Sequence, residues 1–175
     1  MASTVEIRPA TAADGADCAA IYAPYVLETA ISFELEPPGP EAMAARIAAS
    51  DRHAWLIARR GEQALGYAYG ARLHARAAYR WACEVSVYVA RDARAAGVGS
   101  ALYTALFERL VERGYVTAIA GLTLPNPASR ALHAKFGFTE IGTYRGVGFK
   151  LGAWHDVLYV QRDLAPRSQA PAEPL

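Results

Sequence analysis

The sequence contains little cysteine, little net charge and no long apolar run, and each shortage excludes a class of protein. Its 175 residues include two cysteines, Cys18 and Cys83, whose apolar surroundings fit buried, reduced thiols better than a disulfide framework or a metal site. A formal net charge of +1 gives no indication of a nucleic-acid surface. No apolar run approaches the ~20 residues of a membrane helix, and no basic segment leads into a signal-like apolar stretch. We therefore expect a cytoplasmic protein that binds neither nucleic acid nor a membrane.

Several motifs of ligand-binding proteins are also missing. The chain has neither the Gly-Lys-Ser/Thr of a Walker loop nor a G-x-G-x-x-G dinucleotide fingerprint. Its four histidines show no metal-ligand spacing, so we expect no metal site. No internal repeat is visible. A ligand must therefore be recognised by a local arrangement of residues.

The length and composition suit one domain with a substantial core. Of the residues 53% are hydrophobic and 20% are charged, and a chain of this size buries about 70% of the surface that its unfolded form exposes. We expect the domain to span residues 1–164. Residues 165–175 contain three prolines and no apolar periodicity, which predicts a disordered tail.

Apolar periodicity and turn residues predict an α/β fold with a mixed sheet. Strands are expected at residues 5–8, 54–60, 64–72, 85–89, 117–124, 138–144 and 154–164. One helix is expected after Thr11, where Asp14 resembles a capping residue, and a second at 41–50. A third is expected after Gly99, and a fourth opens within residues 125–129 and continues to Phe136. The connection at 73–80 is longer than a tight turn requires, and loops of this kind often carry binding groups.

A glycine loop joins the strand at 85–89 to the next helix. The loop reads Arg94-x-x-Gly97-x-Gly99. Because glycine has no Cβ, the backbone can turn sharply there, and its N–H groups can approach an anion at the positive end of the helix. This pattern predicts a phosphate cradle, although an ordinary glycine turn would look the same.

A second motif follows about thirty residues later, and the two motifs together are a more specific signal than either one alone. It reads Asn126-x-x-Ser129-x-x-Leu132-His133-x-x-x-Gly137-Phe138. Together the two motifs resemble the acetyl-coenzyme A site of the GNAT N-acetyltransferase superfamily. More narrowly, the chain is similar to the phosphinothricin and methionine sulfoximine (or sulfone) acetyltransferases. The stretches that carry this likeness are 75–79 with Trp81 and Glu84, 87–89, 124–126, 132–133, 148–150, 154–156 and 161–163.

The resemblance implies the GNAT acetyltransferase fold, with a central, splayed, mostly antiparallel sheet flanked by helices. The splay would admit the pantetheine arm of acetyl-CoA, the co-substrate. The residues implied to bind it are Val87, Tyr88, Val89, Arg94, Ala95, Ala96, Gly97, Val98, Gly99, Ser100 and Asn126. Lys135 could reach a coenzyme phosphate or could simply be solvated. The resemblance also implies a homodimer.

Acetyl transfer to an amine needs a proton acceptor, because an ammonium has no lone pair, and then a proton for the departing thiolate. Glu84 is a candidate base, since an unpaired carboxylate in an apolar strand is costly to bury and burial would raise its pKa. It could instead be a structural carboxylate. His133 stands where many members of the superfamily carry a tyrosine as general acid, and the phosphinothricin-type enzymes have histidine there. It could relay protons or be an ordinary helix residue. The Val87 N–H is the expected oxyanion donor.

The resemblance points to transfer of an acetyl group onto the α-amine of a small amino acid analogue. Arg76 and Tyr79 would hold its acidic end, since a guanidinium pairs bidentately with such groups, and Phe33 and Trp81 would line the pocket. Direct attack in a ternary complex needs no nucleophile on the enzyme, and no Ser or Cys stands beside a base. The alternatives are acetylation of another small amine or a protein N-terminus, or a non-catalytic acyl-CoA-binding module.

Overall fold

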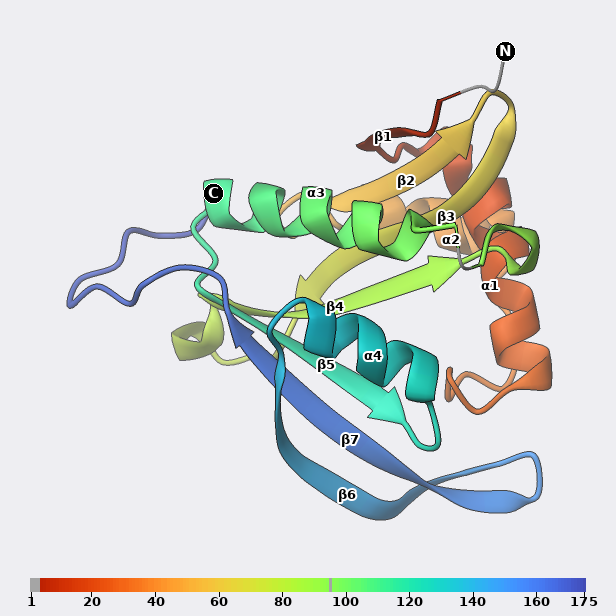
Figure 1. The fold of residues 1–175 in the computed structure, drawn as a ribbon. Coiled ribbons are helices and arrows are strands. Elements are labelled where there is room, and N and C mark those ends of the chain that lie inside the picture. Colours follow the sequence, from red (N-terminus) through yellow and green to blue (C-terminus); the bar gives the residue numbers. More distant parts are fainter. Residues whose placement is uncertain (1–3, 95) are drawn as a thin grey trace.

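A seven-stranded sheet runs through the computed structural model, which describes residues 4–94 and 96–175 (Figure 1). Its order is β1-β2-β3-β4-β5-β7-β6, and neighbours are antiparallel except for the parallel pair β4 and β5. The strands are β1 (Glu6–Pro9), β2 (Trp55–Arg60), β3 (Gln63–Arg72), β4 (Ala82–Val89), β5 (Thr117–Thr123), β6 (Thr139–Lys150) and β7 (Ala153–Asp163). The predicted α/β fold with a mixed, mostly antiparallel sheet is confirmed.

Helices cover both faces of the sheet formed by β1 to β4. The helices that do so are α1 (Gly15–Glu28), α2 (Pro40–Ala48) and α3 (Val98–Glu112), whereas α4 (Pro127–Lys135) follows β5. In Figure 1, α3 crosses one face, and α1 and α2 lie behind the other. Successive residues of β2 therefore enter different cores: Leu56 and Ala58 pack with α3, whereas Trp55 and Ile57 pack with α1 and α2. Burial on both faces explains why the strand is apolar at consecutive positions.

Both cysteines are free and fully buried, as predicted. Cys18 lies in the core under α1 and α2, and Cys83 lies in the core under α3. Burial raises the pKa of each thiol to about 12, so both are uncharged near neutral pH. Among residues 4–94 and 96–175, no group of three or more His, Cys, Asp and Glu side chains could hold a metal ion.

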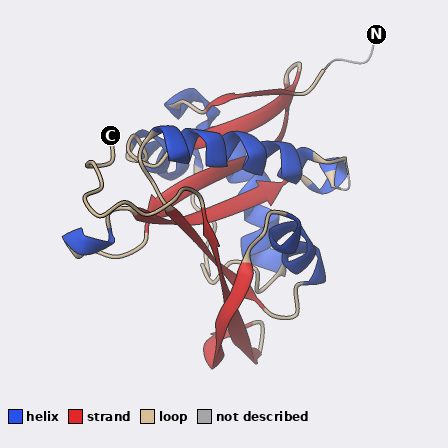
Figure 2. Cartoon of the chain, turned by 60° about the vertical axis from the view of Figure 1, so that its left-hand side comes forward, coloured by secondary structure: helices blue, strands red, loops and turns tan. Residues whose placement is uncertain are grey.

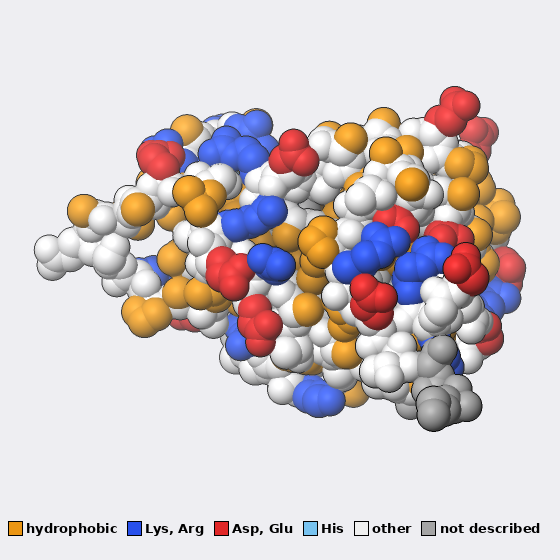
Figure 3. All heavy atoms as spheres, turned by 90° about the horizontal axis from the view of Figure 1, so that it is seen from above, with side chains coloured by type: hydrophobic (Ala, Val, Ile, Leu, Met, Phe, Trp, Pro, Cys, Tyr) orange, Lys and Arg blue, Asp and Glu red, His pale blue; other side chains and the backbone are white. Residues whose placement is uncertain are grey.

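The surface carries charges of both signs close together. On the face seen from above in Figure 3, Lys and Arg side chains lie beside Asp and Glu side chains. Ion pairs at the surface include that of Arg46 with Glu34, at 2.7 Å. Within the described ranges no helix has both the length and the apolar character needed to cross a membrane.

β4 and β5 are paired only where they begin. Their register runs from Ala82 opposite Thr117 to Glu84 opposite Ile119 and stops there. Beyond that point the two arrows diverge in Figure 1. β4 stays paired with β3, and β5 with β7, so each strand keeps one neighbour while the edges that face each other separate. The splayed sheet that the resemblance implied is present.

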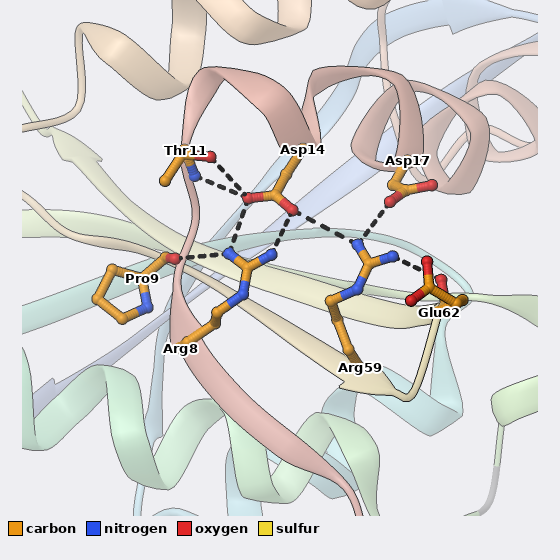
Figure 4. Close-up of polar contacts among 7 residues, drawn as sticks. All are labelled: Arg8, Pro9, Thr11, Asp14, Asp17, Arg59 and Glu62. Carbon is orange, nitrogen blue, oxygen red and sulfur yellow. Dashed lines mark hydrogen bonds and ion pairs between the residues drawn. The ribbon is translucent and has the colours of Figure 1, made fainter.

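A buried carboxylate ties the start of α1 to the sheet (Figure 4). Asp14 is 4% exposed. It accepts hydrogen bonds from the Thr11 backbone N–H at 2.8 Å and from Arg8 at 2.7 and 2.9 Å. Arg59 of β2 bridges Asp14, at 3.4 Å, and Asp17, at 2.5 Å. The hydrogen bonds from Arg8, foremost, lower the pKa of Asp14 to about 2.

We expect Asp14→Asn to destabilise the protein at neutral pH and to remove part of its acid sensitivity. The folded pKa of about 2 lies below the unfolded value of about 3.9. Ionised Asp14 therefore stabilises the fold above the unfolded pKa, and this stability is lost as the pH falls through the folded pKa. The difference corresponds to about 2.5 kcal/mol. Urea unfolding across this pH range measures it; a variant as stable as wild type at neutral pH would contradict the assignment.

β6 and β7 form a long hairpin that extends away from the rest of the sheet (Figure 2). β6 continues to Lys150, whereas the sequence predicted a strand ending at Tyr144. The register shifts between Glu140 and Gly142 and again between Tyr144 and Gly148. Such bulges let a strand bend and then resume pairing, which strand periodicity does not reveal.

The last residues of the C-terminal segment, 172–175, contact the body of the protein, although we predicted disorder for the whole segment. The Trp81 indole N–H donates to the Ala172 carbonyl at 2.8 Å, and Arg80 pairs with Glu173 at 2.8 Å. The Leu175 N–H donates to the Arg113 carbonyl at 2.9 Å. Composition predicts whether a segment can form a core of its own. It does not show that the segment can bind to a surface formed by residues far away in the sequence.

Candidate active site

The glycine loop forms the start of α3 and one wall of a cavity of about 440 Å³. Gly97 is the N-cap of α3 and has φ 77° and ψ 1°, a left-handed conformation that residues with a Cβ rarely adopt. Gly99 faces β4 and α4, where a Cβ would lie 3.6 Å from Val89 and Leu132. Backbone conformation therefore favours glycine at Gly97, whereas a Cβ at Gly99 would make ordinary van der Waals contacts with Val89 and Leu132.

Most residues expected to bind the coenzyme line this cavity, which we call the coenzyme cavity. Its lining consists of Tyr25, Ile31, Val87, Val89, Ala93, Arg94, Gly97, Val98, Gly99, Ser100, Asn126, Ala128, Ser129 and Leu132. Tyr88 points into the opposite core, where its ring packs against Tyr22 and Tyr67. Ala96 is exposed and does not border the cavity. Ala95 lies outside the described residues.

The start of α3 has the features of an anion site. The Lys135 ammonium donates a hydrogen bond at 3.0 Å to the hydroxyl of Ser100, in the first turn of α3. Arg94, just before the helix, stacks on Tyr25 with 5.2 Å between the guanidinium carbon and the ring centroid. The helix dipole and these two cations all favour negative charge here. A pyrophosphate therefore fits this end of the cavity.

The open edge of β4 provides backbone groups, and Tyr25 already uses some of them. The Tyr25 hydroxyl donates to the Val89 carbonyl at 2.6 Å and accepts from the Val89 N–H at 3.3 Å. Because backbone groups alternate in direction along a strand, those of Val87 face the same side, toward the splay. In this arrangement the backbone groups of Val87 face the splay, whereas those of Val89 are engaged by Tyr25.

Glu84 lies at the last position where β4 pairs with β5. It borders a second cavity, of about 560 Å³, which we call the acceptor cavity. Its lining consists of Leu73, His74, Tyr79, Glu84, Ile119, Ile141, Gly142, Thr143, Tyr144 and Tyr159. Burial raises the pKa of the Glu84 carboxyl, and the nearby charge of His74 opposes this only in part. The pKa shift has the direction expected of a proton acceptor.

The structure places Tyr79 beside Glu84 but places Arg76 in an adjoining cavity. Tyr79 borders the acceptor cavity, and its ring meets that of His74 edge to face at 4.6 Å. Arg76 lines a neighbouring basic cavity of about 300 Å³. The full lining of this basic cavity is Arg52, His53, Arg72, His74, Arg76, Ala77, Tyr79, Arg80, Ala82, Tyr115 and Glu173. His74 and Tyr79 border both cavities, whereas Arg76 borders the basic cavity and Glu84 borders the acceptor cavity.

Phe33 and Trp81, the other two expected pocket residues, border neither of these cavities. Phe33 is 39% exposed and packs so closely over Gly148 that a Cβ there would overlap its ring. Trp81 contacts the C-terminal segment through Ala172. Neither residue therefore lines the predicted pocket.

His133 is 4% exposed and uses both ring nitrogens. Nδ1 lies 2.8 Å from the Ser129 carbonyl, and because a carbonyl can only accept, Nδ1 carries the proton. Nε2 then accepts from the Tyr103 hydroxyl at 2.9 Å. Burial lowers the pKa of the imidazole. His133 is thus a neutral acceptor that borders the splay itself and contacts Tyr103.

Tyr103 is a residue that the sequence analysis missed. It occupies an apolar position of α3, so its place in the helix predicted only core packing. It borders a small cavity of about 50 Å³ in the splay, together with Val87, Asn126 and His133. A fully buried tyrosine hydroxyl usually has a hydrogen-bond partner, and the sequence contains no local pattern that would have identified His133 as that partner. Asn126 also accepts from the Ser129 N–H at 3.1 Å and thereby caps α4.

Comparison with known proteins agrees with this geometry. The family model described as Acetyltransferase (GNAT) family matches residues 21–138. A phosphinothricin N-acetyltransferase of Streptomyces viridochromogenes is 39% identical over 173 residues, covering 98% of this chain and 94% of that protein. An L-methionine sulfoximine/L-methionine sulfone acetyltransferase of Pseudomonas paraeruginosa is 34% identical over 134 residues, covering 70% and 78%.

A solved structure shows the same fold. The phosphinothricin acetyltransferase of Sinorhizobium meliloti, crystallised with AcCoA, superposes with a TM-score of 0.91 at 33% identity and covers 97% of this chain and 94% of that one. The family match spans more than half of the chain, and it includes the glycine loop, Glu84 and His133. This chain therefore belongs to the acetyltransferase (GNAT) family, as an acetyl-CoA-dependent N-acetyltransferase.

Proposed function

We propose that this enzyme acetylates the α-amine of a small amino acid analogue of the phosphinothricin, methionine sulfoximine or methionine sulfone type. The observation that supports it most is the succession of cavities along β4. The coenzyme cavity and the small cavity in the splay share Val87, Asn126 and Ser129. Glu84 stands next along the strand, in the acceptor cavity. A thioester and an amine bound from opposite ends would meet in the splay.

The residues of this chain fit acetyl-CoA as a co-substrate. The start of α3, with Lys135 and Ser100, would hold the pyrophosphate. The Val87 carbonyl would accept from a pantetheine amide, and the Val87 N–H would stabilise the oxyanion that forms on the acetyl group. Because Glu84 has a raised pKa, it can take the proton of an incoming ammonium directly or through water. We propose that the neutral amine then attacks the thioester directly in a ternary complex.

The acidic end of the acceptor would lie toward the basic cavity. Tyr79 and His74 border both the acceptor and the basic cavity, so an amine near Glu84 would place its carboxylate or phosphinate toward Arg76. A guanidinium binds such oxygen pairs bidentately. A polyamine would be repelled by the arginines of this cavity, which argues against that class of acceptor.

We expect Arg76→Ala to raise the KM for the amino acid analogue about tenfold or more and to leave the acetyl-CoA dissociation constant unchanged, because the change removes a contact to one ligand only. Arg80→Ala is the matched control, since it removes the same charge nearby, from a side chain that pairs with Glu173. Steady-state kinetics measures both variants. Equal increases in the two variants would show that only the local positive charge matters.

A single assay tests the proposed function. Release of free thiol from acetyl-CoA is followed with a panel of phosphinothricin, methionine sulfoximine, methionine sulfone, polyamines and peptides with free N-termini. Turnover should be fastest with the amino acid analogues. Faster turnover with peptides would assign a protein N-terminus as the acceptor, and coenzyme binding without thiol release would leave a non-catalytic acyl-CoA-binding module.

We also infer a homodimer through the β6–β7 hairpin. Large apolar side chains are exposed along it: Tyr144, Val147, Phe149, Leu151 and Trp154, each at least 53% exposed. A concentrated apolar surface of this kind typically marks an interface. Sedimentation velocity should show a dimer, and Phe149→Lys with Trp154→Lys should yield a monomer. A wild-type monomer at micromolar concentration would contradict the inference.

A further inference from the structure

Ile31 lies at the junction of two cavities of the site. It lines both the coenzyme cavity and the small cavity in the splay, as Val87, Asn126 and Ser129 also do. Those three residues lie on β4 and at the start of α4, whereas Ile31 lies in the loop between α1 and α2. A thioester that reaches from the coenzyme cavity into the splay would therefore pass Ile31.

Hydrogen bonds hold the loop on both sides of Ile31. The Thr29 hydroxyl accepts from the Ile31 backbone N–H at 3.1 Å and donates to the Tyr25 carbonyl at 2.6 Å. On the other side, Ser32 is 5% exposed, and its carbonyl accepts from the Lys150 ammonium at 2.6 Å. Because the backbone is bonded to α1 and to the end of β6, Ile31 is a fixed part of the cavity wall.

The small cavity matches an acetyl group in size. Its volume is about 50 Å³. A cavity needs about 10–15 Å³ to hold one water molecule, and a cavity of about 150 Å³ holds benzene. A group of about three heavy atoms, such as acetyl, lies between these limits. A longer acyl chain would need more room than the small cavity offers.

The deep walls of the small cavity are core side chains, and Ile31 is not one of them. Val85, Tyr103 and Leu122 are at most 3% exposed and belong to the core under α3. Ile31, by contrast, is 40% exposed and belongs to neither core cluster. Shortening Ile31 would therefore enlarge the space for an acyl group without leaving a void in the core.

We propose that Ile31 limits the length of the acyl group that the enzyme transfers, so that acetyl-CoA is selected over propionyl-CoA and longer acyl-CoAs. Val87 and Ile31 line the same small cavity. With the thioester carbonyl at the Val87 N–H, the end of a lengthened acyl chain would overlap Ile31. One methylene in an apolar pocket changes specificity by about 10–200-fold. The proposal rests on the proposed meeting of thioester and amine in the splay.

Steady-state kinetics with three acyl donors tests the proposal. Wild-type kcat/KM should fall about tenfold or more from acetyl-CoA to propionyl-CoA, and again to butyryl-CoA. Ile31→Ala should raise the butyryl-to-acetyl ratio of kcat/KM about tenfold or more. Leu35→Ala is the matched control, because Leu35 lies in the same loop, is 73% exposed and borders none of the cavities described above. It should keep the wild-type ratio.

Three results of this experiment would overturn the proposal. They are equal wild-type kcat/KM for acetyl-CoA and butyryl-CoA, an unchanged ratio in Ile31→Ala, and the same increase in Ile31→Ala and Leu35→Ala. The last of these would show that the loop as a whole, rather than the side chain of Ile31, determines the acyl length.

Binding measured without an acceptor separates this proposal from the proposed function. S-ethyl-CoA and S-butyl-CoA are thioethers that transfer no group. In calorimetry, Ile31→Ala should bind S-butyl-CoA about tenfold more tightly than wild type does, and S-ethyl-CoA within about twofold. Ile31→Phe should weaken S-ethyl-CoA and spare free coenzyme A, because it fills the small cavity.

Equal changes in the affinity for both thioethers, or a loss of affinity for free coenzyme A, would show that Ile31 supports the coenzyme site in general and would overturn the proposal. A wild-type enzyme that binds S-ethyl-CoA but releases thiol with no amino acid analogue would overturn the proposed function instead. The thioether affinities would still decide whether Ile31 limits the acyl length.

Discussion

Glu84→Gln will lower kcat about 100-fold or more at neutral pH and leave the acetyl-CoA dissociation constant within about twofold of wild type. The amide keeps the shape of the side chain and loses the proton acceptor. Glu84 borders the acceptor cavity and not the coenzyme cavity, so coenzyme binding should be spared. Burial raises the pKa of Glu84, which moves the acidic limb of the wild-type rate profile toward neutral pH.

The pH profile and the stability of this variant provide two checks. As the pH rises, more of the amine is neutral in solution, so the variant should recover relative to wild type. Ionised Glu84 with a raised pKa destabilises the folded state above that pKa, so the variant should melt at the same or a higher temperature at neutral pH. A loss in kcat of less than about threefold, or about 0.65 kcal/mol, would mean that the amine arrives neutral.

Gly97→Val will weaken acetyl-CoA binding about 100-fold, and the reason lies in the backbone rather than in steric bulk. An added Cβ at Gly97 would meet no described atom within 4 Å. The left-handed conformation with φ 77° is instead strongly unfavourable for a β-branched residue. Relaxation of the loop would turn N–H groups away from the pyrophosphate. Each charge-assisted hydrogen bond lost costs about 1.5–3 kcal/mol, and each 1.4 kcal/mol is about tenfold in affinity.

Gly97→Asn is the matched control, because asparagine tolerates the left-handed region far better than valine. Isothermal titration calorimetry should show an acetyl-CoA affinity close to that of wild type for the asparagine variant and much weaker for the valine variant. Equal affinities in the two variants would show that the conformation of Gly97 does not position the pyrophosphate. Gly99→Val should also weaken binding, but by filling the space along β4 between Val89 and Leu132.

The sequence predicted those parts of the site that depend on local pattern. The glycine loop, the strand that carries Glu84 and the helix that carries His133 each have a signature within about ten residues, and each element is present in the structure. The predicted direction of the Glu84 pKa shift is confirmed for the same reason: a carboxylate in an apolar strand is desolvated wherever that strand packs in the core.

Contacts between distant residues could not be predicted in this way. The bond between Tyr25 and Val89 joins residues on α1 and β4, and the bond between Tyr103 and His133 joins α3 to α4. In both cases a tyrosine within an apolar pattern is predicted only to pack in the hydrophobic core. The position of its hydroxyl is set by tertiary packing. Trp81 was expected in the pocket because of its position in the sequence, but its indole N–H contacts the C-terminal segment.

The C-terminal segment contacts the connection between β3 and β4 and also borders the basic cavity. It forms an ion pair with Arg80 and a hydrogen bond with Trp81, and the same connection carries Arg76 and Tyr79. Its residue Glu173 borders the basic cavity. The Glu173 carboxylate borders the cavity toward which we propose that the acidic end of the acceptor points. Preparations that differ only in residues 172–175, through trimming or an affinity tag, should therefore differ in their KM for the acceptor and have the same affinity for acetyl-CoA.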